Sequence, residues 1–349
     1  MEQSEEKLLF FTFNQDGSCF CTGTDKGFRI YNSNPLKCLK KRDIDGGVGI
    51  IEILERCNVM AFVGTGNNPK FSPYKVILWD EKEAKVINEL IVIDPIKNIK
   101  LKRTKIFIVC ESKIIVFALG NYEKIDSLKT IQNKNGIFGI SLNSKTTLIS
   151  YPAPEVGKII VKNYDEKKNG NYITNEIKAH QNEIVAIVMN QEGTLLASAS
   201  EKGTLIKIFQ TKDGAMIQEL RRGTRPAEIY CLSFDFRSLY IACTSNQGTT
   251  HIFNVKSEKN KVENQKSLIG NVYSFFGGVS EYLSSEWSFA QYRLPFYEKS
   301  IINFCSDSSI IVLTSDGMYH QGEFDPKFGK ECSTSLEKNF SNLEIEIDD

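Results

Sequence analysis

The chain has 349 residues, of which 41 % are hydrophobic and 25 % are charged, a composition typical of a globular protein that folds in water. Its 43 lysines and arginines balance 43 aspartates and glutamates, so no overall positive field attracts nucleic acid, and any anion site must be local. No apolar run approaches about 18 residues, and the first residues lack the basic and apolar regions of a signal peptide. We therefore expect neither a membrane span nor a secretory leader.

Three stretches of the chain share one pattern of short strands. Each reads as a strand, a polar turn, a strand ending in small hydroxyl residues, a Lys-Gly or Gln-Gly turn and an apolar strand. They occupy residues 13–31, 189–209 and 234–253. This unit resembles the WD40 repeat, in which four strands form one blade of a β-propeller. The Trp-Asp signature of that repeat survives only at Trp79-Asp80.

The remaining strand-like runs fall between these three repeats. They lie within residues 48–93, 96–130, 137–177 and 301–324. Together with the repeats they predict an all-β, WD40-like propeller of about seven blades, each about 50 residues long. No helical periodicity competes with this interpretation. We expect a single domain over residues 1–337, followed by an acidic, mobile tail at 338–349.

The first and last repeats each contain enough strands for a blade of their own. We therefore expect the ring to close without a strand borrowed from the other terminus.

The number and spacing of the cysteines and histidines argue against a metal site and against a catalytic nucleophile. Nine cysteines are scattered without a Cys-x-x-Cys pair, and the closest two, Cys19 and Cys21, are a weak metal signal. We expect the cysteines to be small buried hydrophobes in a reducing cytosol. The three histidines include His180, which we expect to be structural at the entry to a blade. No catalytic motif is present, which favours a binding module without cofactor or metal over an enzyme.

One segment, residues 256–287, interrupts the strand pattern. Its first part is rich in lysine and asparagine, and its second part is aromatic and aliphatic. A basic half beside an apolar half is what a segment lying in a membrane interface requires. The alternative is a loop folded onto the propeller wall. The residues expected to insert are Leu268, Ile269, Tyr273, Phe275 and Phe276.

Arg221 and Arg222 stand side by side in the sequence Leu-Arg-Arg-Gly at the end of a predicted strand. Successive side chains of a strand point to opposite faces, so the two arginines should serve two different sites. The alternative is that they merely protect the exposed edge of a sheet from aggregation.

Hydroxyl and cationic residues flank the arginine pair on both sides, and Ser198 and Ser200 share a strand face, as do Thr249 and His251. Arginine with hydroxyl donors is the combination that binds phosphate. The alternative for each flank is ordinary turn chemistry. The complete candidate set is Ser198, Ser200, Gly203, Thr204, Lys207, Arg221, Arg222, Gly223, Ser245, Thr249 and His251.

The stretch that contains the arginine pair resembles a known family. Residues 179–234 look like the centre of a PROPPIN, the WIPI-type family of phosphoinositide-binding β-propellers, and the Leu-Arg-Arg-Gly run matches its [F/L]RRG signature. The likeness extends over nearly the whole chain and is closest to short WIPI-type members. It departs at Lys207, where relatives often carry arginine, and at Arg225, where some carry an acid.

The resemblance implies two shallow headgroup sites at the rim, formed by the candidate set, for phosphatidylinositol 3-phosphate and phosphatidylinositol 3,5-bisphosphate. It implies an adaptor, monomeric in solution, that is cytoplasmic and peripherally bound to preautophagosomal, endosomal or vacuolar membranes. Segment 268–283 would be the inserting loop. The alternative function is a WD40 protein scaffold without lipid binding.

The resemblance also implies autophagy proteins as partners, among them the large lipid-transfer protein of autophagy. Asn14 and Asp16 match the turn that some members use for this contact, although residues 14–17 are equally a good hairpin turn. With an ordinary pKa of about 6.5, His251 would gain a proton beside a phosphate, so that acid would strengthen binding.

Overall fold

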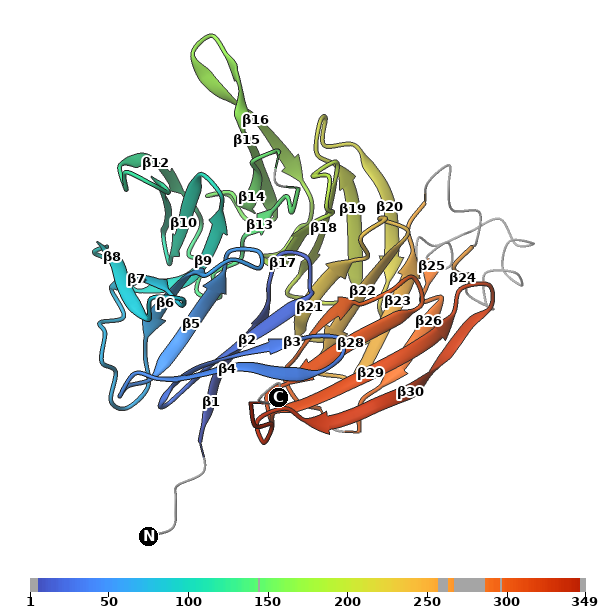
Figure 1. The fold of residues 1–349 in the computed structure, drawn as a ribbon. Helices are drawn as coiled ribbons and strands as arrows, with labels where there is room; N and C mark the ends of the chain where they lie inside the picture. Colours follow the sequence, from blue (N-terminus) through green and yellow to red (C-terminus); the bar gives the residue numbers. More distant parts are fainter. Residues whose placement is uncertain (1–5, 144, 257–262, 267–285, 296, 346–349) are drawn as a thin grey trace, which may run out of the picture. The chain divides into compact units, whose positions relative to one another are not determined.

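The computed structural model describes residues 6–345 except 144, 257–262, 267–285 and 296. Every regular element in the described part of the chain is a β-strand (Figure 1). The all-β prediction is therefore confirmed. The strands follow one another as antiparallel meanders, which is the arrangement that short strands joined by tight turns favour.

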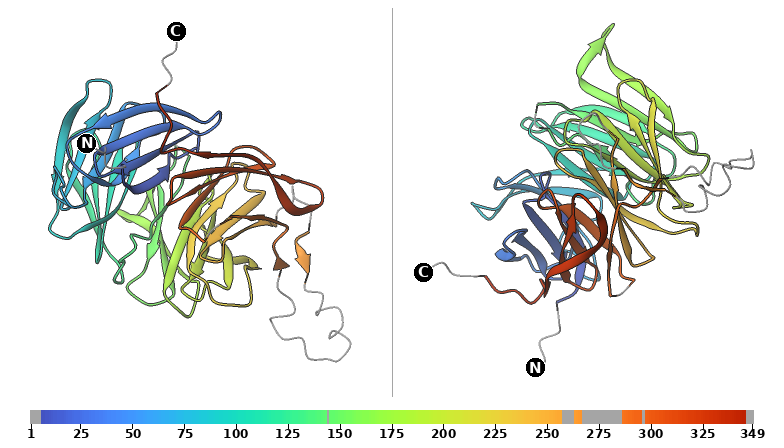
Figure 2. Two further views of the ribbon diagram at one scale, coloured as in Figure 1. Left: turned by 90° about the horizontal axis from the view of Figure 1, so that it is seen from below. Right: turned by 90° about the vertical axis from the view of Figure 1, so that its right-hand side faces the viewer.

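The first half of the chain forms four-stranded sheets, each in the order of the sequence. The first two comprise β1 (Leu8–Phe13), β2 (Cys19–Thr24), β3 (Gly27–Asn32) and β4 (Lys37–Asp43), then β5 (Val48–Ile53), β6 (Val59–Gly64), β7 (Lys75–Asp80) and β8 (Lys85–Ile91). The next two comprise β9 (Ile96–Lys102), β10 (Lys105–Cys110), β11 (Lys113–Ala118) and β12 (Lys124–Lys129), then β13 (Gly139–Ile140), β14 (Leu148–Pro152), β15 (Lys158–Lys168) and β16 (Asn171–Lys178). The β15–β16 hairpin extends past the sheet to which it belongs (Figure 2).

The second half forms larger sheets. A six-stranded sheet runs β17-β18-β19-β20-β25-β24, from β17 (Ile184–Met189), β18 (Leu195–Ser200), β19 (Leu205–Gln210), β20 (Met216–Arg221), β24 (Gln265–Lys266) and β25 (Glu286–Trp287). An eight-stranded sheet runs β21-β22-β23-β26-β30-β29-β28-β27. Its strands are β21 (Ile229–Phe234), β22 (Tyr240–Ser245), β23 (Thr249–Asn254), β26 (Ala290–Arg293), β27 (Ser300–Phe304), β28 (Ser309–Thr314), β29 (Met318–Asp325) and β30 (Gly329–Asn339).

The three sequence repeats share one turn in the structure. In each, a side-chain carbonyl or carboxylate oxygen accepts a hydrogen bond from the backbone N–H five residues later, which closes the hairpin between the first two strands of a sheet. The pairs are Asn14 with Cys19 at 3.0 Å, Asn190 with Leu195 at 2.9 Å and Asp235 with Tyr240 at 2.6 Å. Short polar side chains that bond nearby backbone are the local cause of such turns.

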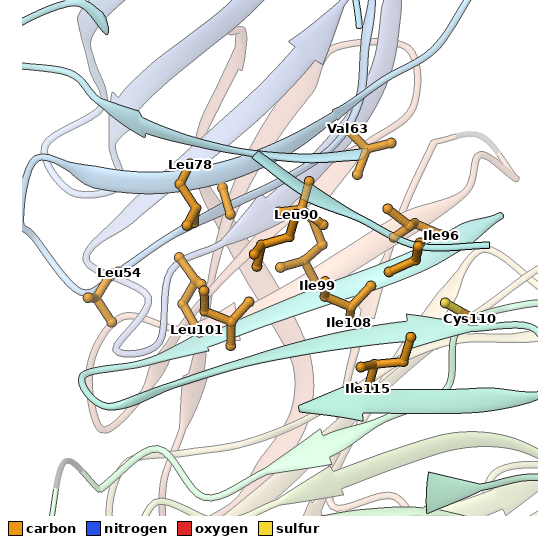
Figure 3. Packing of buried hydrophobic residues seen from close by; sticks show 14 residues of the cluster. Leu54, Val63, Leu78, Leu90, Ile96, Ile99, Leu101, Ile108, Cys110 and Ile115 are labelled. Carbon is orange, nitrogen blue, oxygen red and sulfur yellow. The ribbon is translucent and has the colours of Figure 1, made fainter. Parts of the chain in front are cut away.

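The chain divides into two compact units: the first comprises residues 1–138, 313–319 and 337–349, and the second residues 139–312 and 320–336. A core of the first unit lies between β5–β8 and β9–β12, where Leu78, Leu90 and Ile99 point toward one another (Figure 3). In the second unit, Leu220 of β20 packs with Cys243 and Phe253 of the sheet that follows. This core fixes which face of β20 looks toward β21–β23.

The packed part of the chain continues past residue 337, where we expected the domain to end and a mobile tail to begin. β30 continues to Asn339, and Phe340 is fully buried, with its ring centroid 5.3 Å from that of Phe20 and 5.6 Å from that of Tyr31. Ile345 forms a parallel bridge with Cys38. Burial of one aromatic side chain holds this segment where the sequence shows only acidic residues around it. The sheet β1–β4 is built wholly from residues 8–43.

The cysteine prediction also needs one correction. Six of the nine cysteines are buried and two are half-buried, as expected of small hydrophobes, but Cys57 is exposed. It lies in the turn between β5 and β6, where it contributes no packing to the interior.

Candidate functional site

The first face of β20 carries one half of the candidate set. In the strand register, Lys207 lies opposite both Ser198 and Glu219, and Leu205 lies opposite Arg221. Because alternate residues share a face, Ser198, Ser200, Lys207, Glu219 and Arg221 lie on the same side of this sheet. We call Ser198, Ser200, Lys207 and Arg221 the Arg221 group.

The opposite face points toward β21–β23. Leu220 packs into the core on that side, and Arg222 follows it two positions later. On the facing sheet, Cys243 lies opposite His251, so Ser245, Thr249 and His251 share the face that looks toward Arg222. We call Arg222, Ser245, Thr249 and His251 the Arg222 group. The two arginines therefore lie on opposite faces, as the alternation of strand residues predicts.

Arg222 is held by the turn between β18 and β19. Its Nε donates to the carbonyl oxygen of Gly203 at 2.9 Å, its Nη2 donates to the carbonyl of Arg225, and its backbone N–H donates to Thr204 at 2.9 Å. Gly203 has φ +60°, and an added Cβ would lie 1.8 Å from the carbonyl oxygen of Ala227. Only glycine fits at position 203, and the backbone carbonyls of Gly203 and Thr204 both accept hydrogen bonds from Arg222.

Burial distinguishes the arginines from the shallow sites that the resemblance implies. Arg221 is 9 % exposed and Arg222 is 5 % exposed. Burial lowers the pKa of the Arg222 guanidinium. Arginine stays charged in proteins even so, and a charge removed from water gains more from an anion than one on the surface. Gly223 is half-buried, and a Cβ there would meet no atom within 4 Å.

The Arg221 group contains two contacts that the sequence did not indicate. His180 Nε2 lies 3.0 Å from Ser198 Oγ, which brings this histidine into the group. Burial and the charge of Lys207 lower the pKa of His180 to about 4, so the ring is neutral. Lys207 Nζ forms an ion pair of 3.6 Å with Glu219. The position of His180 just before β17, the neighbour of β18, was the available signal.

The Arg222 group is more enclosed. Ser245 is 2 % exposed, and its Oγ accepts a hydrogen bond from the backbone N–H of Gln247 at 3.4 Å, the turn chemistry that the alternative anticipated. His251 is half-buried, and its Nδ1 lies 3.1 Å from Ser288 Oγ. Burial and the charge of Arg222 lower the pKa of His251 to about 4. The expectation of an ordinary pKa for His251 is therefore wrong, because a ring partly removed from water beside a cation resists protonation.

The described ends of the long segment lie against β20. β24 and β25 pair with each other, and β25 also pairs in parallel with β20, with Arg221 opposite Trp287. Glu286 accepts hydrogen bonds from Gln218 at 2.6 Å and Asn264 at 2.9 Å, and it forms an ion pair with Lys256. Burial opposes ionisation, but these donors hold the pKa of Glu286 below its ordinary value.

The residues predicted to insert into a membrane lie outside the described part of the chain. They are Leu268, Ile269, Tyr273, Phe275 and Phe276. Of the predicted partner-binding residues, Asn14 is 6 % exposed and closes its own turn, with Nδ2 also donating to the carbonyl of Glu55 at 3.1 Å. Asp16 is exposed and accepts a hydrogen bond from Ser18 N–H at 3.0 Å. Asn14 thus has a structural role in its hairpin, and Asp16 is accessible to a partner.

Comparison with known proteins assigns the fold to a family. The PROPPIN family model matches residues 7–341. The chain belongs to the PROPPIN family. It is similar to autophagy-related protein 18e of Arabidopsis thaliana, 30 % identical over 98 % of this chain and 90 % of the relative. Autophagy-related protein 18 of Dictyostelium discoideum is 31 % identical over 97 % of this chain and 94 % of the relative.

Solved structures agree with this fold. Kluyveromyces lactis Hsv2 is 24 % identical to this PROPPIN, with a TM-score of 0.78. The aligned region covers 96 % of this chain and 99 % of the Hsv2 chain. KlAtg21, solved with the coiled coil of AgAtg16, is 22 % identical with the same coverages and a TM-score of 0.75. At such identities the likeness shows the fold alone, an all-β propeller.

Family membership places this PROPPIN among autophagy-related, phosphoinositide-binding propellers, a family that is not enzymatic in general. Within the part of the chain that the structure describes, no helix is long and apolar enough to cross a membrane.

Proposed function

We propose that this PROPPIN binds phosphatidylinositol 3-phosphate and phosphatidylinositol 3,5-bisphosphate through the Arg221 group and the Arg222 group, and that it recruits autophagy proteins to the membranes carrying them. The observation that carries the proposal is that the adjacent arginines point to opposite sides of the sheet β17–β20. Arg221 shares its face with Ser198, Ser200 and Lys207, and Arg222 points toward the face of β21–β23 that carries Ser245, Thr249 and His251. A guanidinium supplies paired, charge-assisted hydrogen bonds to a phosphate, and hydroxyl groups satisfy the remaining oxygens.

The described contacts argue against the alternative of an arginine-guarded edge. β20 is not a bare edge at this point, because β25 pairs with it at Leu220 and Arg221. The arginines are also 9 % and 5 % exposed, whereas charges that guard an edge must reach the solvent. The described hydrogen-bond acceptors of the Arg222 guanidinium are the backbone carbonyls of Gly203 and Arg225, and a buried cation bound in this way gains from an anionic ligand.

The strand order supports a propeller of seven blades in a single domain. The eight-stranded sheet contains two meanders, β21-β22-β23-β26 and β27–β30, whose strands pair with each other in parallel where Ala290 and Gln291 lie opposite Lys330 and Glu331. Counting these meanders separately, together with β17–β20 and the sheets of the first half, gives seven four-stranded blades.

Membrane attachment and partners complete the proposal. We expect peripheral binding, with the segment 268–283 inserting into the membrane near the Arg221 group, because β25 after that segment pairs with β20 and β24 before it pairs with β25. The relative solved with a coiled coil makes autophagy proteins reasonable partners, and Asp16 is accessible for the lipid-transfer protein.

Flotation of the full chain with liposomes tests the function. Vesicles of phosphatidylcholine, with and without phosphatidylinositol 3-phosphate, should separate lipid-dependent from lipid-independent binding. Arg221→Ala and Arg222→Ala should each retain partial binding, and the double variant should lose it, since each charged contact contributes roughly 1.5–3 kcal/mol.

The matched control is Arg237→Ala, which removes an exposed arginine that is ion-paired with Asp307 in the same unit. It should bind as the unmodified protein does. Full retention of lipid-dependent binding by the double variant, with an unchanged unfolding temperature, would refute the two-site proposal. If the unmodified protein did not distinguish the two kinds of vesicle, the protein-scaffold alternative would be supported instead.

A further inference from the structure

The imidazole of His251 lies within hydrogen-bonding distance of Ser288, a residue that the sequence analysis did not single out. Ser288 follows β25 directly and is 2 % exposed. Its Oγ lies 3.1 Å from His251 Nδ1 and accepts a hydrogen bond of 2.9 Å from Gln291 Nε2. Gln291 of β26 lies opposite His251 of β23 in the register, so both side chains lie on one face. The three side chains form a connected chain: Gln291, Ser288 and His251.

The hydrogen-bonding capacity of Ser288 restricts how the histidine is protonated. A hydroxyl has one proton and two lone pairs, and Gln291 occupies one lone pair. If His251 Nδ1 carried a proton, it would take the second lone pair, and the buried hydroxyl proton would need another acceptor. Among the described residues, Ser288 Oγ has no hydrogen-bond partner besides Gln291 and His251. The hydroxyl proton therefore points at Nδ1, which accepts it.

The choice of tautomer matters because the ring is neutral. Burial and the charge of Arg222 lower the pKa of His251 to about 4. The other neighbours of the ring are Cys243, opposite it on the adjacent strand, and the Phe253 ring, whose centroid is 6.1 Å away. A neutral imidazole has one N–H. With Nδ1 as the acceptor, that N–H is on Nε2, which forms no hydrogen bond with any described residue.

We infer that Ser288, oriented by Gln291, is a positioning residue that fixes His251 in its Nε2–H tautomer, so that the neutral ring donates a hydrogen bond to an anionic phosphate at the Arg222 group. The tautomer assignment stands on the protein contacts alone. Only the phosphate as ligand rests on the proposed function. The opposite tautomer would present a lone pair to the anion and repel it.

His180 in the Arg221 group provides an internal comparison. Its Nε2, rather than its Nδ1, faces the serine, Ser198, at 3.0 Å. A change at Ser288 should therefore alter His251 and leave His180 unaffected.

The test records two-bond ¹H–¹⁵N correlations of the imidazoles in the ¹⁵N-labelled full chain at neutral pH, without ligand. The chain has three histidines, so His→Gln variants assign every signal. We expect His251 as the Nε2–H tautomer in the unmodified protein and in Ser288→Thr, and a mixture of tautomers in Ser288→Ala. A pure Nδ1–H pattern for His251, or a spectrum that Ser288→Ala leaves unchanged, would overturn the inference.

Binding of the soluble dibutanoyl headgroup of phosphatidylinositol 3-phosphate adds a second readout. In an Arg221→Ala background, which leaves only the Arg222 group, Ser288→Ala should weaken binding about three- to tenfold. In an Arg222→Ala background it should have no effect. Equal weakening in both backgrounds would indicate a general structural role and refute the positioning role. If the unmodified protein bound no headgroup, the proposed function would fail, while the ligand-free spectra would still decide the role of Ser288.

Discussion

Arg222 Nε donates a hydrogen bond of 2.9 Å to the backbone carbonyl of Gly203. The turn between β18 and β19 thereby orients a guanidinium supplied by the end of β20. The contact needs a left-handed residue at position 203, where φ is +60° and the carbonyl oxygen of Ala227 would lie 1.8 Å from a Cβ. Arg222 is thus positioned by backbone that only glycine can form.

Substitution of Gly203 should consequently affect both stability and the Arg222 group. Gly203→Ala should cost about 1–3 kcal/mol of unfolding free energy, because the turn must shift away from Ala227. The shift should move the carbonyl that holds Arg222 and weaken headgroup binding in an Arg221→Ala background. Urea denaturation measures the unfolding free energy, and titration calorimetry measures headgroup binding. Gly223→Ala is the matched control for stability, since its Cβ would meet no atom within 4 Å; equal destabilisation by both would contradict the steric account.

Glu219 should restrain the Arg221 group. Its carboxylate forms an ion pair of 3.6 Å with Lys207 Nζ, so a phosphate must compete for that lysine. Glu219→Gln keeps the size of the side chain and removes the charge. We expect headgroup affinity to rise about two- to fivefold in an Arg222→Ala background, the effect of a partly exposed ion pair. Titration calorimetry at low salt measures it, and an unchanged or lower affinity would show that Lys207 does not contact the phosphate.

His180 and His251, both half-buried, should make the stability of the fold sensitive to mild acid. The pKa values of His180 and His251 are lowered to about 4 in the folded protein, against about 6.5 in an unfolded chain. Below about pH 6.5 the unfolded state therefore binds more protons, and stability falls until about pH 4. Above the pKa of the unfolded chain, about 6.5, neither state binds these protons and the histidines no longer lower the stability. The thermal midpoint should decline from pH 6.5 to 5, and the paired variant His180→Gln with His251→Gln should decline less; identical slopes would exclude the histidines.

Headgroup binding itself should follow a different pH profile. Since the pKa values of His180 and His251 are lowered to about 4, both rings stay neutral between pH 8 and pH 6 and add no positive charge to the sites in this range. The phosphate has its own second pKa of about 6, so binding should weaken modestly toward acid rather than strengthen. Headgroup titrations at pH 6, 7 and 8 measure this trend. Clearly stronger binding at pH 6 would show that His251 becomes protonated beside the phosphate after all.

Aromatic residues in the long segment should matter for membranes but not for the soluble headgroup. Phe275→Asp with Phe276→Asp should weaken liposome binding, because one ring contributes on the order of 2 kcal/mol when its apolar area leaves water. Binding of the soluble headgroup should be spared. The matched control is Phe236→Asp, which changes an exposed phenylalanine in the turn between β21 and β22. Equal loss of both binding activities in the first variant would indicate a structural role for the segment.

Much of this protein was determined by local sequence. The repeated turns follow from Asn14, Asn190 and Asp235, each of which bonds the backbone five residues later, so the strands could be placed without any distant contact. The alternation of side chains along a strand was sufficient to separate Arg221 from Arg222. These are properties of single hairpins and single strands, and they do not depend on where the rest of the chain lies.

The tertiary structure alone decided what surrounds the arginines. Ser288 is 37 positions from His251, His180 is 18 positions from Ser198, and Glu286 is 68 positions from Gln218. Such pairs carry no shared local signal, because they form only when separate strands pack together. Burial is likewise a sum over distant neighbours. The sequence analysis therefore expected shallow sites, an ordinary pKa for His251 and a mobile tail, whereas packing buries Arg221, Arg222 and Phe340.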